Sequence, residues 1–172
     1  IHIVELRVWQ SGKFAMRVIE TSLYKGFALR VMRPKATVIE HCNYPFSQPT
    51  SAAIAMTDSL RLMALKNQCQ VAICTDKNMV ITAVDGATPI VVHGTAITIS
   101  NSVISVYSNI VISALKKLPN HTVTIRPVTL TEALSADELF YADSRGITAV
   151  GSLNSTHYSD SIAYAAAKNI AF

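Results

Sequence analysis

The fold is decided by residues 126–140, whose sequence is RPVTLTEALSADELF. In and just beyond this stretch we expect a short helix over 130–135 and a strand over 138–142. A second strand is predicted over 147–150, after a charged turn, and another over 123–125 precedes the helix. Short strands that alternate with a helix indicate a domain of mixed α and β structure.

Upstream of this stretch, the pattern predicts a long helix and a group of strands. A helix is expected from Ser51 to Lys66, and its broad apolar face indicates that it is mostly buried. Turn sequences separate short β-rich runs, which predict four successive antiparallel strands over 71–74, 79–81, 89–92 and 96–99. Two further helices are expected, over 104–118 and over 157–168.

The N-terminal part of the chain combines a turn with a long irregular segment. Residues 2–9 alternate as a strand that ends in turn residues, and residues 14–24 carry apolar side chains at roughly helical spacing. Residues 27–32 alternate as a second strand. Residues 34–50 contain three prolines, which lack the backbone donor that a helix or ladder needs. We therefore expect 34–50 to be an extended, partner-contacting linker with little internal pairing.

The composition is that of a folded chain with few charges. Of its 172 residues, 50% are hydrophobic, and the 15% that are charged fall below the usual quarter. This predicts a surface that is covered partly by other protein subunits. The three cysteines are too few for a disulfide scaffold, and Cys69 and Cys74 are expected to be small buried side chains. Cysteines and histidines show no metal-ligand spacing, so no metal site is predicted.

No transmembrane segment is expected, although residues 86–115 carry no Asp, Glu, Lys or Arg. Polar residues and a proline interrupt this stretch before it reaches the ~18 consecutive apolar residues that a spanning helix needs.

The positive charge is concentrated at the N-terminus. Residues 1–35 hold seven Lys and Arg against two acidic residues. One interpretation is contact of Arg30, Arg33 and Lys35 with the phosphates of a nucleic acid, and the other is an ordinary solvated surface. The chain begins at Ile1 rather than Met, which is typical either of a processed product or of an incomplete chain. The basic N-terminal portion, the start without Met and the low surface charge together predict a location in a mitochondrial or other organellar complex.

The stretch 126–140 is similar to a motif of the fold-type IV pyridoxal-phosphate enzymes, in which a short helix precedes a strand that begins Ala-Asp-Glu-hydrophobic-Phe. Ile147–Val150 resembles the Ile-Thr-Pro-Val of the same family, and residues 4–14 look like its first strand and hairpin. The family includes branched-chain and D-amino acid aminotransferases and aminodeoxychorismate lyases.

This resemblance covers about residues 48–150 and, with fewer matching residues, 4–23. It implies an α+β fold like the large domain of class IV aminotransferases, with a mostly antiparallel sheet or barrel and flanking helices. The implied domains are a small-domain remnant over 1–33, the linker over 34–50 and a large-domain-like core over 51–172.

The residues that the family uses for its cofactor are replaced in this chain. The family's lysine, which forms a Schiff base with pyridoxal phosphate, matches Pro49 and Thr50, and its pyridine-binding glutamate matches Ala83. Asp85 lies two residues further and is interpreted either as a substitute for that glutamate or as a hairpin residue.

The phosphate-binding segments of the family are replaced as well. Asn101–Ile104 stand where the family has Leu-Pro-Gly-Ile-Thr-Arg before a helix. The second phosphate turn becomes Asp143–Gly146, in which Ser144 and Arg145 could hold an anion but Asp143 would oppose it. Lys35 and Lys66 are the nearest alternative cofactor lysines.

These replacements predict a chain with no catalytic residue and no cofactor, which acts as a structural subunit of a larger, organellar protein assembly. Two alternatives stay open. One is a divergent pyridoxal-phosphate lyase or aminotransferase, and the other is an RNA-contacting protein of an organellar ribosome.

Overall fold

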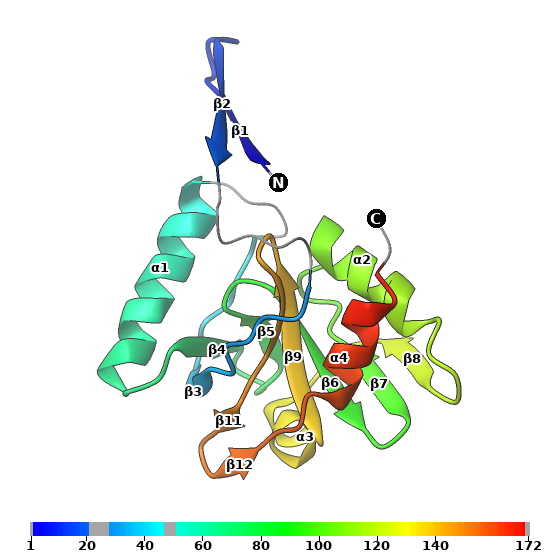
Figure 1. Ribbon diagram of the computed structural model, residues 1–172. Coiled ribbons are helices and arrows are strands. Elements are labelled where there is room, and N and C mark those ends of the chain that lie inside the picture. The colour runs from blue at the N-terminus through cyan, green and yellow to red at the C-terminus, as the bar shows by residue number, and fades with distance from the viewer. Residues whose placement is uncertain (1, 21–27, 47–50, 171–172) are drawn as a thin grey trace.

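The computed structural model describes residues 2–20, 28–46 and 51–170 (Figure 1). The helices within these residues are α1 (Ser51–Lys66), α2 (Val106–Leu115), α3 (Leu130–Ser135) and α4 (Ser161–Lys168). None of these described helices has the length and hydropathy that crossing a membrane requires.

Strands of the described residues form two five-stranded sheets and a separate hairpin. The first sheet has the order β10 (Gly146–Ala149), β9 (Glu138–Asp143), β6 (Thr88–His93), β7 (Ala96–Ile99), β8 (Thr122–Ile125). The second sheet has the order β12 (Thr156–His157), β11 (Ser152–Leu153), β3 (Lys35–Ile39), β4 (Val71–Thr75), β5 (Ile81–Val84). The hairpin pairs β1 (His2–Val8) with β2 (Phe14–Glu20).

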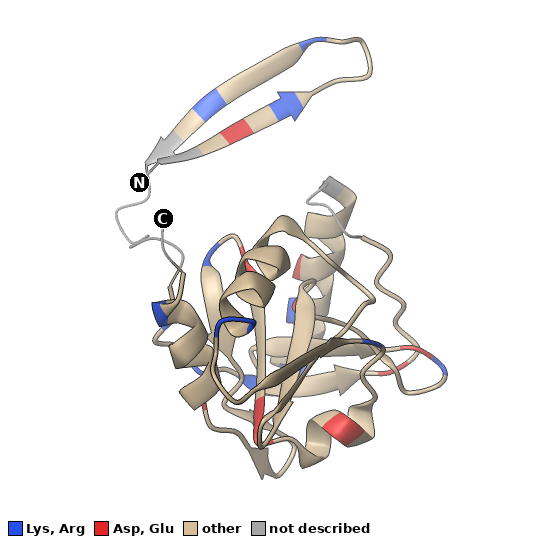
Figure 2. Ribbon diagram, turned by 90° about the vertical axis from the view of Figure 1, so that its right-hand side faces the viewer, with Lys and Arg blue, Asp and Glu red and all other residues tan. Residues whose placement is uncertain are grey.

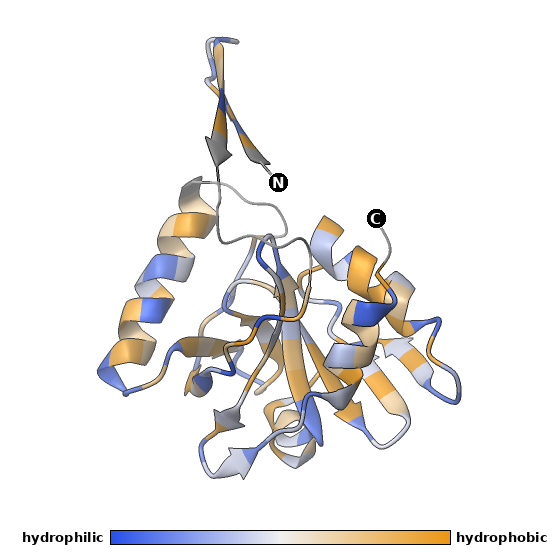
Figure 3. Ribbon diagram, in the orientation of Figure 1, coloured by the Kyte–Doolittle hydropathy of each residue, from blue (hydrophilic) through white to orange (hydrophobic). Residues whose placement is uncertain are grey.

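The two five-stranded sheets pack against each other, and helices cover their outer faces. Between the sheets lies a cluster that includes Ile73 of β4 and Leu139 of β9. A second cluster joins the first sheet to α2 and α4, and a third joins the second sheet to α1. Figure 3 shows the apolar residues along β6, β7 and β9 at the centre of this arrangement. The predicted α+β fold with flanking helices is therefore confirmed.

Burial on both faces explains why these strands lack a polar side in the sequence. In β9, Leu139 and Tyr141 point between the sheets, whereas Phe140 and Ala142 point toward α2 and α4. Successive side chains of a strand alternate between its faces, so a strand buried on both sides is apolar at almost every position.

The prediction of a linker over 34–50 is wrong for residues 35–39. They form β3, which pairs in parallel with β11 on one side and β4 on the other. Ala36 is fully buried, and the carbonyl of Pro34 accepts a hydrogen bond from Gly151 N at 2.8 Å. The expectation of little internal pairing was wrong here because both partner strands are far away in the sequence. Residues 47–50 lie outside the described residues.

The prediction of helical structure over residues 14–24 is also wrong, because residues 14–20 belong to the N-terminal hairpin. Residues 14–20 form β2 rather than part of a helix over 14–24, and every residue of β1 has an antiparallel partner in β2. The spacing of Phe14 and Val18 fits both periods, but Met16 between them completes the alternation of a strand. The strand expected over 27–32 is represented among the described residues by one bridge, from Leu29 to Ile147.

Three smaller expectations also change. The runs β4–β5 and β6–β7 are antiparallel pairs, but they belong to different sheets. Helix α4 begins at Ser161, because residues 156–157 pair as β12. Helix α1 is not mostly buried, since Ile54, Leu62 and Leu65 are 58–62% exposed.

A buried carboxylate holds the start of α4 against the first sheet. Glu138, only 2% exposed, accepts hydrogen bonds from Ile162 N at 2.9 Å and Ala163 N at 3.2 Å, and from the Ser159 hydroxyl at 2.9 Å. The N-cap residue Asp160 makes no side-chain capping bond of its own. A negative charge at a helix N-terminus satisfies free N–H groups and the helix dipole, so Glu138 takes the role that a capping residue normally has.

We predict that Glu138→Gln lowers the free energy of unfolding by about 2 kcal/mol, because the charged acceptor of two backbone N–H groups is lost from a buried position. Thermal or urea unfolding measures this change. Asp160→Asn is the control and is expected to change stability by less than ~0.5 kcal/mol. Equal effects of the two variants would contradict the role of Glu138.

Candidate functional site

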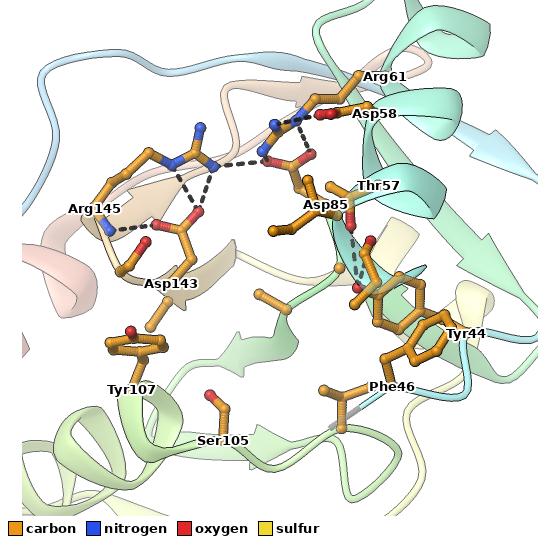
Figure 4. A pocket seen from close by; sticks show the side chains of 17 residues that line it. Tyr44, Phe46, Thr57, Asp58, Arg61, Asp85, Ser105, Tyr107, Asp143 and Arg145 are labelled. Carbon is orange, nitrogen blue, oxygen red and sulfur yellow. Dashed lines mark hydrogen bonds and ion pairs between the residues drawn. The ribbon is translucent and has the colours of Figure 1, made fainter. Parts of the chain in front are cut away.

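A cavity of about 320 Å³ opens between α1, the turn from β5 to β6, the start of α2 and the turn from β9 to β10 (Figure 4). One wall is aromatic: Tyr44 and Phe46 meet edge to face with ring centroids 5.5 Å apart. The Tyr44 hydroxyl lies 3.0 Å from the Thr57 hydroxyl of α1. The opposite wall carries charged side chains and ends at the β9–β10 turn.

Asp85 lies at the centre of the charged wall because of the turn that carries it. The backbone of Asp85 and of Gly86 is left-handed, with φ of 51° and 77°, and Val84 and Ala87 exchange two backbone hydrogen bonds across the turn. A Cβ on Gly86 would lie 2.6 Å from the Thr57 hydroxyl, so glycine is needed for close approach as well as for its φ. The turn therefore brings the Asp85 carboxylate against α1.

Two arginines from different elements converge on Asp85 (Figure 4). Arg61 of α1 donates from Nε to Oδ1 at 2.7 Å and from Nη2 to Oδ2 at 2.8 Å. Arg145 of the β9–β10 turn donates from Nη2 to Oδ2 at 2.9 Å, and Tyr141 of β9 donates its hydroxyl to the same oxygen at 3.4 Å. The Asp85 side chain is 4% exposed, so its charge is balanced by these partners rather than by water.

The remaining charges occupy the outer donors of the two arginines. Arg145 Nε donates to Asp143 at 2.9 Å, and Arg61 Nη1 reaches Asp58 at 3.4 Å. Two guanidinium groups therefore face three carboxylates. The charged wall carries no surplus positive charge, and it does not favour a phosphate dianion.

The pKa values of the cluster follow from the same contacts. Hydrogen bonds to Asp85 raise the pKa of Arg61 and outweigh the burial that lowers it. Burial lowers the pKa of Arg145. The hydrogen bonds and charges of Asp143 and Asp85 raise it by more, so the pKa of Arg145 lies above its ordinary value. Burial, together with the negative charges of Asp85 and Asp143, raises the pKa of Tyr141. Both arginines stay charged, and the phenol keeps the proton that it donates.

The structure brings together only part of the residues singled out by sequence. Ser144, Arg145 and Asp85 line the cavity. The backbone of Asp85 makes the hairpin turn that one of its two interpretations predicted. Ala83 is fully buried in the cluster beneath α1 and does not line the cavity. Thr50 lies outside the described residues.

The N-terminus of α2 is capped by side chains of the chain itself. The Ser105 hydroxyl accepts a hydrogen bond from Ser108 N at 3.2 Å, and the Ser108 hydroxyl accepts one from Ser105 N at 2.8 Å. This reciprocal capping box satisfies donors that a phosphate would otherwise use. The predicted loss of the family's phosphate segment at 101–104 thus coincides with a capped helix.

Other candidate groups lie away from the cavity or are engaged elsewhere. Neither Lys35 nor Lys66 lines it. Arg33 pairs with Asp160 at 3.7 Å. Burial raises the pKa of the Cys74 thiol. Among the described residues, no three His, Cys, Asp or Glu side chains are grouped as a metal ion would require.

Sequence analysis missed Arg61, the residue that holds Asp85 in a bidentate pair. The available signal was a charged residue inside the apolar stretch LRLMAL over 60–65 of α1. A cation among apolar helix residues indicates a partner on a neighbouring element, but it does not identify that partner.

The fold is that of fold-type IV aminotransferases. The chain is similar to an aminotransferase from Brucella abortus bound to pyridoxal phosphate, with a TM-score of 0.76 and 13% identity over 94% of this chain and 60% of that one. It is also similar to a branched-chain aminotransferase from Thermoproteus uzoniensis, with a TM-score of 0.74 and 15% identity over 91% of this chain and 55% of that one.

A putative 4-amino-4-deoxychorismate lyase from Legionella pneumophila gives a TM-score of 0.71 and 12% identity over 91% of this chain and 61% of that one. The chain spans 48–61% of the length of such structures. No protein-family model matches the chain, and no curated protein matches it.

The described residues do not fit pyridoxal phosphate. No lysine is among the described residues that line the cavity, and the position that matches the pyridine-binding glutamate is a buried alanine that faces α1. Asp85, the nearest carboxylate, already accepts from two guanidinium groups. The Asp143 carboxylate lies beside the turn where the family binds phosphate. Among the described residues, the charged side chains of the cavity form an internal ion-pair network.

We predict that Asp85→Ala lowers the free energy of unfolding by about 2 kcal/mol, because it leaves Arg61 and Arg145 without their shared carboxylate. This loss of stability is expected to be smaller than the loss on breaking a fully buried ion pair, because both guanidinium groups are about one third exposed or more. Urea unfolding measures it. Asp58→Ala removes a 61% exposed carboxylate from the same cluster and is expected to change stability by less than ~0.5 kcal/mol.

Proposed function

We propose that this chain is a non-catalytic protein that uses a class IV aminotransferase-like fold as a structural subunit of a larger protein assembly. The observation that carries the proposal is the Asp85 network, in which both cavity arginines are bound to carboxylates of the chain itself. A fold does not determine a function, and the residues of a site decide which chemistry it performs.

The exposed apolar residues support action through the surface. On α1, Ile54, Leu62, Met63 and Leu65 are 45–62% exposed, although the sequence has the apolar content of a buried helix. The charged residues of the body are sparse in Figure 2. A surface with few charges and exposed large apolar side chains is typical of protein contact.

A divergent pyridoxal-phosphate lyase or aminotransferase is the second candidate, and the fold relatives favour it. It would need a lysine that reaches the cavity and a carboxylate for the pyridine nitrogen. The lysine could be Lys25, which lies in an undescribed segment, or a lysine of another chain. The undescribed segments contain no Asp or Glu, so a carboxylate other than those already described would have to come from another chain.

We predict that the purified chain incubated with pyridoxal phosphate shows no visible absorbance band of a lysine-bound cofactor and no mass increase after borohydride reduction. A branched-chain aminotransferase treated in parallel is the positive control. A reduced adduct on one lysine, such as Lys25, Lys35 or Lys66, would overturn the proposal in favour of the divergent enzyme. Scattered adducts on many lysines would represent the ordinary reactivity of surface amines and leave it standing.

A further inference from the structure

We propose that Cys42 and Cys74 are a redox-active pair, which a small-molecule disulfide such as glutathione disulfide converts into an intramolecular disulfide bond. The inference goes beyond the proposed function, because it concerns two thiols of the second sheet rather than the content of the cavity. It comes from the backbone contacts of the two cysteines, the cluster that their side chains share and the difference in their exposure.

The backbone that follows β3 runs beside the end of β4. His41 has a left-handed φ of 55°, and the next residue, Cys42, donates from its backbone N to Thr75 O at 2.8 Å. The Thr82 hydroxyl of β5 lies 2.8 Å from the carbonyl oxygen of Cys42 and 3.3 Å from that of Cys74. The two cysteines therefore lie next to each other in the fold, although they are far apart in the sequence.

Both cysteine side chains lie on the side of the second sheet that faces α1. Cys74 belongs to the buried cluster beneath α1, and Cys42 packs against the same cluster. Both thiols are free, and the Cys42 side chain is a hydrogen-bond partner of the Cys74 thiol. A disulfide forms only between side chains that already point toward each other, and these two thiols meet that condition.

The two thiols differ in exposure, which assigns a different role to each. Cys74 is 1% exposed, whereas Cys42 is partly exposed. Burial raises the pKa of Cys74, and hydrogen bonding to Cys42 and the negative charges of Cys42 and Asp85 raise it further. Because the thiolate is the form that attacks a disulfide, Cys74 does not react with a dissolved disulfide itself. Cys42 is the thiol that such a molecule reaches first.

Two thiol–disulfide exchange steps lead to the product. In the first, the Cys42 thiolate attacks one sulfur of glutathione disulfide, whose S–S bond breaks, and one glutathione leaves with the proton that Cys42 lost. In the second, the Cys74 sulfur loses its proton and attacks the Cys42 sulfur, and the other glutathione leaves as a thiol. The two cysteines together lose two electrons, which reduce one glutathione disulfide to two glutathione molecules. Cys42 carries no negative charge in the intermediate, so its charge no longer raises the pKa of Cys74 in the second step.

The new bond would connect the aromatic wall of the cavity to the second sheet. Tyr44 and Phe46 follow Cys42 closely in the sequence, and the Tyr44 hydroxyl lies 3.0 Å from that of Thr57 (Figure 4). Residues 42–74 would become a closed loop that contains α1. Closing a loop lowers the entropy of the unfolded chain, so the oxidised protein is expected to be more stable than the reduced protein.

Cys69 provides the matched control. It is 4% exposed and belongs to the same cluster as Cys74, but its thiol donates to the backbone oxygen of Asn67 at 3.3 Å. Cys69 is therefore a buried thiol that is hydrogen-bonded to its own turn. We expect Cys69→Ala to form the disulfide as wild type does, whereas Cys42→Ser and Cys74→Ala cannot form it.

The test incubates the folded full chain with a mixture of oxidised and reduced glutathione and measures the intact mass and the peptide map. We expect wild type and Cys69→Ala to lose the mass of two hydrogen atoms and to give one cross-linked peptide pair, which holds Cys42 and Cys74. Cys74→Ala should stop at the intermediate, with one glutathione bound to Cys42. Cys42→Ser should keep both buried thiols free.

Thermal unfolding gives a second readout. Oxidised wild type should melt about 5 °C or more above its reduced form, and dithiothreitol should abolish this difference. Cys42→Ser, treated in the same way, should melt at the same temperature in both mixtures. Each variant is compared with itself, so a change in stability from the substitution alone does not affect the result.

Three results would overturn the proposed pair: a wild type that keeps three free thiols in the oxidising mixture, a cross-link that includes Cys69, or glutathione addition to Cys42→Ser as fast as to wild type. If Cys74→Ala does not fold, the cross-linked peptides of wild type and the behaviour of Cys42→Ser still decide. None of these measurements involves pyridoxal phosphate, so the redox pair and the proposed function can fail separately.

Discussion

The site of this protein depends on one buried carboxylate, that of Asp85. A charge that is 4% exposed is tolerated only with full compensation, and here the compensation comes from Arg61 on α1 and Arg145 after β9. The pair with Arg61 ties α1 to the β5–β6 turn, and the pair with Arg145 ties the β9–β10 turn to the same point. One side chain thus joins the helix outside the second sheet to the end of the first sheet, and it sets the shape of the cavity between them.

The same interaction determines how the charged side chains of the cavity are used. The sheets and helices match aminotransferases at TM-scores of 0.67–0.76, yet the cavity arginines are bound to carboxylates of the chain. The cluster between the sheets, the covers formed by α2 and α4, and the Glu138 cap are independent of the cofactor residues, so the cavity can change while the core stays intact.

The sequence predicted the elements whose pattern is local and missed those that depend on distant partners. Helix α3 and strand β9 lie where residues 126–140 place them, because capping and alternation are visible within a few residues. β3 was missed because its partners β4 and β11 are remote, and prolines nearby suggested a linker. The triad of Arg61, Asp85 and Arg145 comes from three separate segments, so no spacing in the sequence could have indicated it.

The position of β3 has a consequence for how the chain folds during synthesis. Lys35 and Ala36 of β3 pair with Ser152 and Leu153, so the second sheet stays incomplete until β11 has left the ribosome. Until then β3 has an open edge on the side that β11 later covers, although its other edge can pair with β4. Such long-range pairing slows folding and exposes strand edges in the meantime. A nascent chain of this protein is therefore expected to need protection of that edge by a chaperone until β11 emerges.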